Sequence, residues 1–215
     1  TLYVHLYNQS RAEFQFTGNT VHVEQQTNYP WDGDIRFTVS ADQPTPFELA
    51  LRIPGWCRSY RLEVNGAPTE AAVVDGYARI QRAWANGDQV RLALDMPPER
   101  MMAHPNVRQD AGQVALQRGP VVYCFEEVDN GKHLANVVLP RDSRLAVEID
   151  PSLFGGVSVI TGEAVRIEPS NWSGGLYQSE TVQPVSETRF TFKAIPYGFW
   201  ANREQGEMRV WLRES

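Results

Sequence analysis

Paired carboxylates are the first residues of this sequence that could carry out chemistry. Asp32 and Asp34 flank Gly33, and Glu126 is followed by Glu127. Two carboxyl groups held at a fixed separation are what the hydrolysis of a glycosidic bond requires. Each pair also has a structural interpretation, because Asp and Gly favour tight turns and strands commonly end in solvated charges. We interpret both pairs as structural, with a turn at 32–34 and solvated charges at the end of a strand.

Side chains that could bind a metal are sparse. The four histidines have no close spacing with one another, with cysteine or with carboxylates; they are His5, His22, His104 and His133. Cys124 and Glu126 are two residues apart, so on a strand they would point to the same side and could both contact a metal. A complete zinc site normally has four ligands, and the sequence suggests no further one. A Gly-x-Ser-x-Gly nucleophile motif is also missing, so we expect neither a metal site nor a catalytic residue in this chain.

Aromatic side chains in loops are the remaining candidates for ligand contact. The chain has six tryptophans and eight tyrosines, and those in or beside predicted strands are interpreted as core residues. Trp31, Trp172 and Tyr177 fall in loops, where exposure is more plausible. We predict these three as the carbohydrate contacts of the chain, should it bind a glycan.

Short runs of alternating apolar and polar residues predict the fold. Residues 35–39 and 47–53 alternate cleanly, and Asn65-Gly66 is a strong hairpin signal. Such runs recur about every 8 to 15 residues with turn residues between them, which is typical of antiparallel sandwiches. The most apolar stretch, 113–127, is predicted to lie in the middle of a β core. Because Pro97-Pro98 ends the first series of strands, we predict an all-β chain of two consecutive antiparallel β-sandwich domains, residues 1–100 and 101–215.

Composition excludes several classes of partner. The chain has 20 basic and 26 acidic residues, for a net charge of −6. A nucleic-acid-binding domain normally has a basic patch, and a membrane-spanning helix needs about 20 apolar residues. The sequence has neither feature, so we expect no nucleic-acid partner and no membrane partner. Its two cysteines, Cys57 and Cys124, form no disulfide framework and are predicted to be free, buried thiols.

Several phrases of the sequence, taken in order, resemble one known family. They are LRIPGW (51–56), VNG (64–66), GYARI (76–80) followed by RAW (82–84) and GD (87–88), QRGPVVYC (117–124), and AIPYGFWANR (194–203) with GEM (206–208). In this order they resemble the C-terminal region of glycoside hydrolase family 127, the β-L-arabinofuranosidase family. The resemblance covers essentially the whole chain, and the phrases around 118–123 and 196–203 are its most specific parts.

The resemblance implies a parent enzyme with an (α/α)6 barrel followed by two β-sandwich domains. In that family the barrel holds a cysteine nucleophile on a cysteine-rich zinc site and a glutamate that acts as general acid/base. No residue of this chain matches that apparatus, so the chain alone is predicted to be inactive and to hold no cofactor, with zinc expected in the barrel. Because the chain starts in a strand pattern without methionine, we expect it to be part of a longer polypeptide. The family's intracellular members and the lack of a disulfide pattern favour a cytoplasmic location.

The role that follows is that of an accessory region whose partner is the upstream barrel of the same polypeptide, or a second copy in a homodimer. Tyr197, Trp200 and Arg203 are our candidates for such an interface, because aromatic residues and arginine are enriched at interfaces. Packing within the second sandwich is the alternative explanation for these three. Two other functions stay open: a carbohydrate-binding module that acts through exposed loop aromatics, and an independent zinc hydrolase that uses Cys124.

Overall fold

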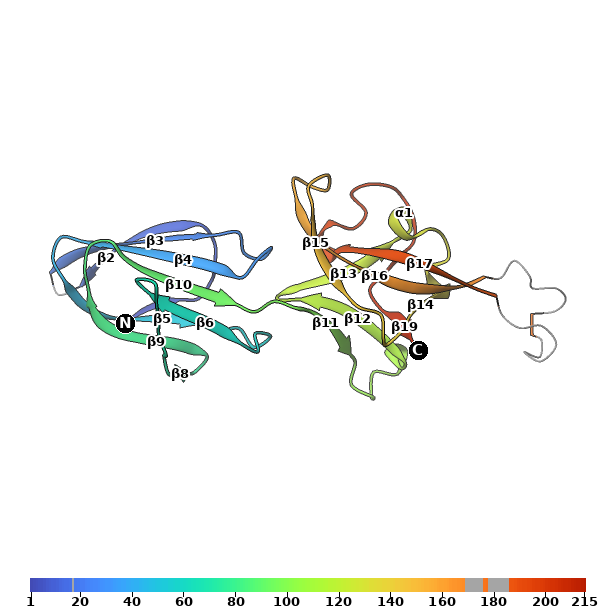
Figure 1. Ribbon diagram of the computed structural model, residues 1–215, viewed down its shortest axis with the longest axis horizontal. Coiled ribbons are helices and arrows are strands. Elements are labelled where there is room, and N and C mark those ends of the chain that lie inside the picture. The colour runs from blue at the N-terminus through green and yellow to red at the C-terminus, as the bar shows by residue number, and fades with distance from the viewer. Residues whose placement is uncertain (17, 169–175, 178–185) are drawn as a thin grey trace. The chain divides into compact units, whose positions relative to one another are not determined.

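The computed structural model describes residues 1–16, 18–168, 176–177 and 186–215, which consist mostly of β-strands and the turns between them (Figure 1). The chain divides into two compact units, Thr1–Pro97 and Pro98–Ser215. These observations confirm the all-β fold with sandwich-like domains that the sequence predicts. The sequence places the boundary between the domains at residue 100, and the structure divides the chain between Pro97 and Pro98.

The first unit, Thr1–Pro97, consists of two sheets that enclose one apolar core. The four-stranded sheet has the order β1 (Leu2–Val4), β5 (Thr45–Arg52), β9 (Tyr77–Trp84) and β8 (Val73–Val74). The six-stranded sheet has the order β2 (Ser10–Phe16), β3 (Asn19–Thr27), β4 (Asp34–Ala41), β10 (Asp88–Leu94), β6 (Tyr60–Val64) and β7 (Ala67–Pro68). Strand β1 pairs with β5 in parallel, whereas the other described pairings of this unit are antiparallel as predicted.

Alternation of side chains along the strands determines which face of the six-stranded sheet is buried. The inward side chains of β4 are fully buried: Ile35, Phe37 and Val39. Arg36, between two of them, is exposed. The four-stranded sheet contributes Trp84, which is also fully buried and donates its indole N–H to the carbonyl oxygen of Phe47 at 3.0 Å. This hydrogen bond offsets the cost of burying a polar N–H, so Trp84, the largest side chain of this core, has no unpaired polar group.

The second unit, Pro98–Ser215, is built on one sheet whose strand pairings close on themselves. Its strands are β11 (Pro98–Met102), β12 (Gln113–Arg118), β13 (Val121–Glu126), β14 (Val137–Leu139), β15 (Ala146–Asp150), β16 (Val157–Glu168), β17 (Ser186–Pro196), β18 (Met208–Arg209) and β19 (Leu212–Glu214). Pairings run from β12 to β13, β17, β16, β14 and β19 and back to β12, with β14–β19 parallel. Short helices α1 (Glu127–Asn130), η1 (Arg108–Asp110), η2 (Leu134–Asn136) and η4 (Tyr197–Phe199) lie in the connections.

Strands β12 and β13 correspond to the apolar stretch that is predicted to form the middle of a β core. Four consecutive residues of β13, 123–126, are buried. Strand β13 pairs with β12 at its beginning and with both β17 and β18 at Phe125, so it has neighbours on both edges. A strand covered on both faces has apolar residues at successive positions instead of alternate ones. This explains the unbroken run of Tyr123, Cys124 and Phe125, whereas Val122 before them is exposed.

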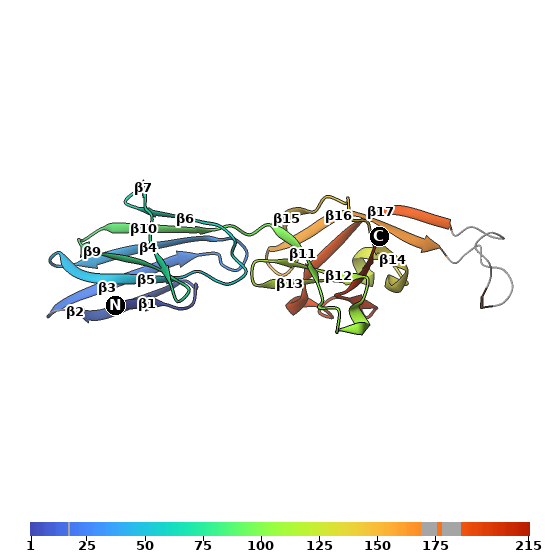
Figure 2. The same cartoon turned by 90° about the horizontal axis from the view of Figure 1, so that it is seen from below.

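Gly162 accounts for one difference between the predicted and observed strands. The sequence predicts separate strands at 156–161 and 164–168, but β16 is continuous and pairs with β17 along most of its length (Figure 2). Gly162 is needed in its middle because a Cβ at this position would lie 2.9 Å from the ring of Phe192. The glycine therefore marks a close approach of another side chain and not the end of a strand.

Predicted and observed strands also differ at the start of the chain and at the beginning of the second unit. The predicted strand at 2–7 ends at Val4, and the ring of Tyr7 turns into the core, where its hydroxyl donates to the carbonyl oxygen of Arg52. Met101 and Met102, which are expected in a connector, belong to β11 and pair with β12.

The turn between β3 and β4 provides a test of the packing in the first unit. Asp32 Oδ1 accepts the backbone N–H of Asp34 at 3.0 Å, as the turn interpretation of these carboxylates predicts. A Cβ on Gly33 would lie 2.1 Å from the carbonyl oxygen of Leu94, whereas a Cβ on Gly55 would meet no atom within 4 Å. We expect Gly33→Ala to lower the free energy of unfolding by about 1–3 kcal/mol through this overlap, and Gly55→Ala to leave it nearly unchanged. Urea denaturation followed by tryptophan fluorescence measures both, and equal stabilities would contradict the described turn.

Candidate functional site

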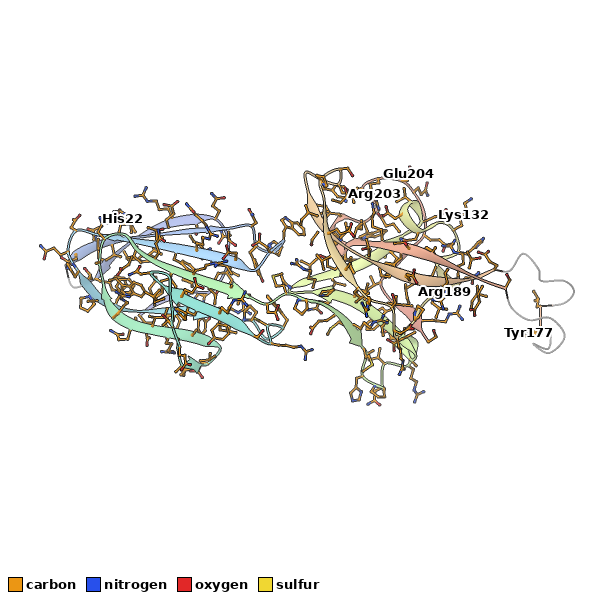
Figure 3. All side chains as sticks on the ribbon, in the orientation of Figure 1. His22, Lys132, Tyr177, Arg189, Arg203 and Glu204 are labelled. Atoms are coloured by element: carbon orange, nitrogen blue, oxygen red, sulfur yellow. The ribbon has the colours of Figure 1, made fainter. Side chains whose placement is uncertain are left out.

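A buried ion cluster connects the end of β13 and helix α1 with the AIPYGFWANR phrase. Arg203, which Figure 3 labels, lies in the segment after η4. It donates through Nη1 to Asp129 Oδ1 at 2.9 Å, and its Nη2 contacts carboxylate oxygens of both Asp129 and Glu126. The side chains of Glu126, Asp129 and Arg203 are only 6%, 9% and 17% exposed. The hydrogen bonds to Asp129 and Glu126 outweigh the effect of burial and raise the pKa of Arg203 above its already high value. The guanidinium therefore stays charged and pairs with two carboxylates that are shielded from most of the solvent.

Glu126 also fixes the backbone of the same segment. Its Oε1 accepts the N–H of Ala201 at 2.8 Å, and Ala201 has a left-handed φ of 60°, which is uncommon for a residue other than glycine. The interpretation of Glu126 as a solvated charge is thus wrong. The reason is that Arg203 lies 77 residues further along the chain, a separation at which local sequence patterns carry no information about contact.

Two of the predicted interface residues lie on this fixed segment. Tyr197 and Trp200 are 43% and 41% exposed, and their rings are nearly parallel, with centroids 6.3 Å apart. Phe199 between them stacks on Phe154 at 4.6 Å. Arg203, the third predicted interface residue, is held inside the second unit, so it positions the aromatic side chains. An exposed aromatic surface on a rigid segment is typical of a binding interface.

A cavity of about 260 Å³ lies beside this surface, lined by Trp200, Arg203 and several glutamates. The carboxylates there make structural hydrogen bonds. Glu127 Oε2 accepts the N–H of Glu207 at 3.0 Å, and Glu207 Oε2 accepts the N–H of Leu134 at 2.8 Å. The acidic side chains around Trp200 therefore tie α1, η2 and the segment before β18 together.

Cys124, the one nucleophile that the sequence suggests, is fully buried. Burial, followed by the neighbouring charge of Glu126, raises the pKa of its thiol to about 12. Within the ranges that the structure describes, no three of the His, Cys, Asp and Glu side chains lie close enough together to hold a metal ion. Cys57 is half-buried and free, and its thiol donates to the carbonyl oxygen of Ser59. Burial raises the pKa of Cys57 as well.

In the first unit, the VNG and GD phrases meet in a similar cluster. Asn65 Nδ2 donates to Asp88 Oδ1 at 2.7 Å, and Asn65 Oδ1 accepts the N–H of Gln89 at 2.8 Å. Asp88 Oδ2 accepts the N–H of Ala85 at 2.8 Å. Burial acts to raise the pKa of Asp88, but these hydrogen bonds and the charge of Arg82 outweigh it and lower the pKa. These phrases connect two turns of the sandwich and present no reactive group.

The predicted carbohydrate contacts belong to different units of the chain. Trp31 is half-buried in the turn of the first unit, and Tyr177 of the second unit is 94% exposed. Trp172 lies outside the described residues. Sequence reasoning missed the polar cavity of about 520 Å³ next to the turn of Trp31, whose lining includes Asn28, Asp32 and Arg36. No helix in the described ranges is long and apolar enough to cross a membrane.

Comparison with known families assigns each of the two units to a described domain family. Residues 1–96 match the family described as the middle domain of GH127 β-L-arabinofuranosidase, and residues 98–213 match the glycoside hydrolase family 127 C-terminal domain. The two all-β units are therefore domains of a glycoside hydrolase. The chain belongs to glycoside hydrolase family 127, as the resemblance of its phrases predicts.

Individual relatives agree with this assignment. The chain is 39% identical over 214 residues to the non-reducing end β-L-arabinofuranosidase of Bifidobacterium longum subsp. longum, covering 93% of this chain and 32% of that protein. It matches the crystal structure of a GH127 β-L-arabinofuranosidase from Geobacillus stearothermophilus T6 with a TM-score of 0.93 and 48% identity, over 99% of this chain and 33% of the other. A further GH127 β-arabinofuranosidase matches with a TM-score of 0.88 and 34% identity, over 99% of this chain and 34% of the other. The chain thus spans about a third of the length of these relatives.

Removal of Arg203 tests the ion cluster. Arg203→Met would leave two buried carboxylates without a cation, so we expect the free energy of unfolding to fall by about 3–5 kcal/mol. Arg189→Met is the control, because the Arg189–Glu163 pair is 74% and 69% exposed, and exposed pairs contribute about 0–1 kcal/mol. Chemical denaturation of both variants measures the difference. A loss for Arg203→Met no larger than that of the control would contradict the role assigned to the cluster.

Alkylation tests the environment of the two thiols. With a pKa near 12, Cys124 has almost no thiolate at pH 8, and its burial blocks access. We expect iodoacetamide at pH 8 to modify Cys57 in the folded chain and Cys124 only after denaturation, as read from intact mass. Two adducts on the folded chain within the same time would show that Cys124 is accessible.

Proposed function

We propose that this chain is the non-catalytic accessory region of a β-L-arabinofuranosidase-like glycoside hydrolase. The catalytic (α/α)6 barrel, with its zinc and nucleophilic cysteine, lies in another part of the same polypeptide. The observation that carries this proposal is that the family's middle and C-terminal domains account for residues 1–96 and 98–213, while the relatives are about three times as long as the chain. The burial and raised pKa of Cys124 support it, because they work against nucleophilic catalysis within the chain.

The accessory role is to cover apolar surface of the barrel or of a second copy. Tyr197 and Trp200 are well suited to such a contact, since they are exposed on a segment that Glu126 and Arg203 hold in place. A rigid surface loses little conformational entropy when it binds a partner. Met102, at the end of β11, is 77% exposed and is another apolar side chain available to a partner.

A comparison of two proteins tests the proposal. The purified 215-residue chain and a version extended N-terminally to the length of its relatives are assayed on an aryl β-L-arabinofuranoside with zinc and a reductant. We expect hydrolysis by the longer protein alone, because the reacting groups belong to the barrel. The Cys124→Ser variant of the 215-residue chain is the control. Hydrolysis by the short chain that this substitution abolishes would overturn the proposal and assign catalysis to Cys124.

A further inference from the structure

The outward face of the six-stranded sheet carries a row of planar polar side chains. Strand register places Gln26 of β3 opposite Arg36 of β4, Arg36 opposite Arg91 of β10, and Arg91 opposite Glu63 of β6. These strands are neighbours in the sheet order, and β3, β4 and β10 can be followed side by side in Figure 1. Four side chains from four strands therefore form a continuous polar row across the sheet.

The two arginines of this row are held close together by a carboxylate. Like charges directly opposite each other destabilise a sheet. The carboxylate of Asp34 offsets the repulsion between the two arginines, because its Oδ2 accepts from Arg36 Nη2 at 2.8 Å and its Oδ1 accepts from Arg91 Nε at 2.7 Å. Partial burial acts to raise the pKa of Asp34, but the bonds from Arg91 and Arg36 outweigh it and lower the pKa.

Stability does not explain this arrangement. Arg36 and Arg91 are 63% and 47% exposed, and ion pairs as exposed as these contribute little to folding. What the arrangement does achieve is to orient two guanidinium groups that still have free N–H donors facing solvent. Preorganised donors reduce the entropy cost of binding a ligand.

Two connected depressions lie along the row. The larger, of about 520 Å³, is lined only by polar residues, among them Gln26, Asn28, Asp32 and Arg36. The other, of about 360 Å³, shares Gln26 and Arg36 and continues to Arg91 and Glu63. Among the described residues, the side-chain amide of Asn28 makes no hydrogen bond within the protein. The groove thus offers amide, carboxylate and guanidinium groups at successive positions.

The chemistry of the groove selects its ligand. Arg36 and Arg91 carry two positive charges against the three carboxylates of Asp32, Asp34 and Glu63, so the lining has no excess of positive charge that would favour a simple anion. Guanidinium groups supply paired donors, carboxylates supply paired acceptors, and amides supply both. Adjacent hydroxyl groups of a sugar can pair with all three. We propose that this groove binds a neutral oligosaccharide, with Gln26, Arg36 and Arg91 as hydrogen-bonding contacts.

This inference goes beyond the accessory role, and either can hold without the other. It also differs from the sugar contacts predicted at loop aromatics, because polar residues of strands and of the turn before β4 form the groove. Trp31 belongs to the turn that supplies Asn28 and Asp32 to the larger depression.

An NMR titration of the 215-residue chain with linear arabinohexaose tests the proposal. We expect shifts of the backbone amides at 26–36 and 89–91, and at least a tenfold loss of affinity in Arg36→Ala. Asn28→Ala, which removes no hydrogen bond within the protein, is expected to weaken binding several-fold with the spectrum of the folded chain retained. Arg189→Ala, on the second unit, is the control and should bind as the unmodified chain does.

Three results would overturn the proposal. One is the absence of shifts at millimolar arabinohexaose and at millimolar xylohexaose, a second neutral probe. Another is a set of shifts confined to residues outside the groove, such as Tyr177. The third is tighter binding of oligogalacturonate, a charged probe, since a groove without an excess of positive charge has no reason to prefer an anion.

Discussion

Burying a carboxylate costs free energy unless a cation and hydrogen-bond donors contact it. The structure of the second unit depends on the groups that contact Glu126. Its partners come from a segment far along the chain, the guanidinium of Arg203 and the N–H of Ala201. Because the same guanidinium also binds Asp129 of α1, one cation fastens the end of β13, the following helix and the segment after η4. The exposed position of Trp200 is a consequence, since its neighbour in sequence is held by the buried carboxylate.

The same principle accounts for the family's phrases in both units. In the first unit, Asn65 donates to Asp88, and each of the two side chains also accepts a backbone N–H, so that one turn is joined to another. Turn residues with free backbone donors need side-chain acceptors, and Asn and Asp supply them at little conformational cost. The VNG, GD and AIPYGFWANR phrases therefore contain residues that close loops onto sheets.

The strands could be predicted wherever burial alternates regularly, and were missed where it does not. Residues 35–39 alternate because one face of β4 is in the core and the other in solvent. Strand β14 has only three residues, too few for a period of two to be recognised. The sequence predicts two strands where β16 is continuous, because it does not show the carbonyl oxygen of Arg144 and the ring of Phe192 that leave room only for a glycine at position 162. Contacts across long separations, above all Glu126 with Arg203, follow from the topology, which local patterns do not specify.

The groove of the first unit was missed for a related reason. Gln26, Arg36, Arg91 and Glu63 are far apart in sequence, and each alone is an ordinary outward residue of a strand. They become neighbours only through the register of β3, β4, β10 and β6. That register is specified by the inward residues, since a shift of one position would bring Arg36 into the core in place of Phe37. The apolar side of each strand therefore determines the fold and, through it, which polar side chains meet on the other face. A sandwich built in this way can carry a binding surface without altering the core that supports it.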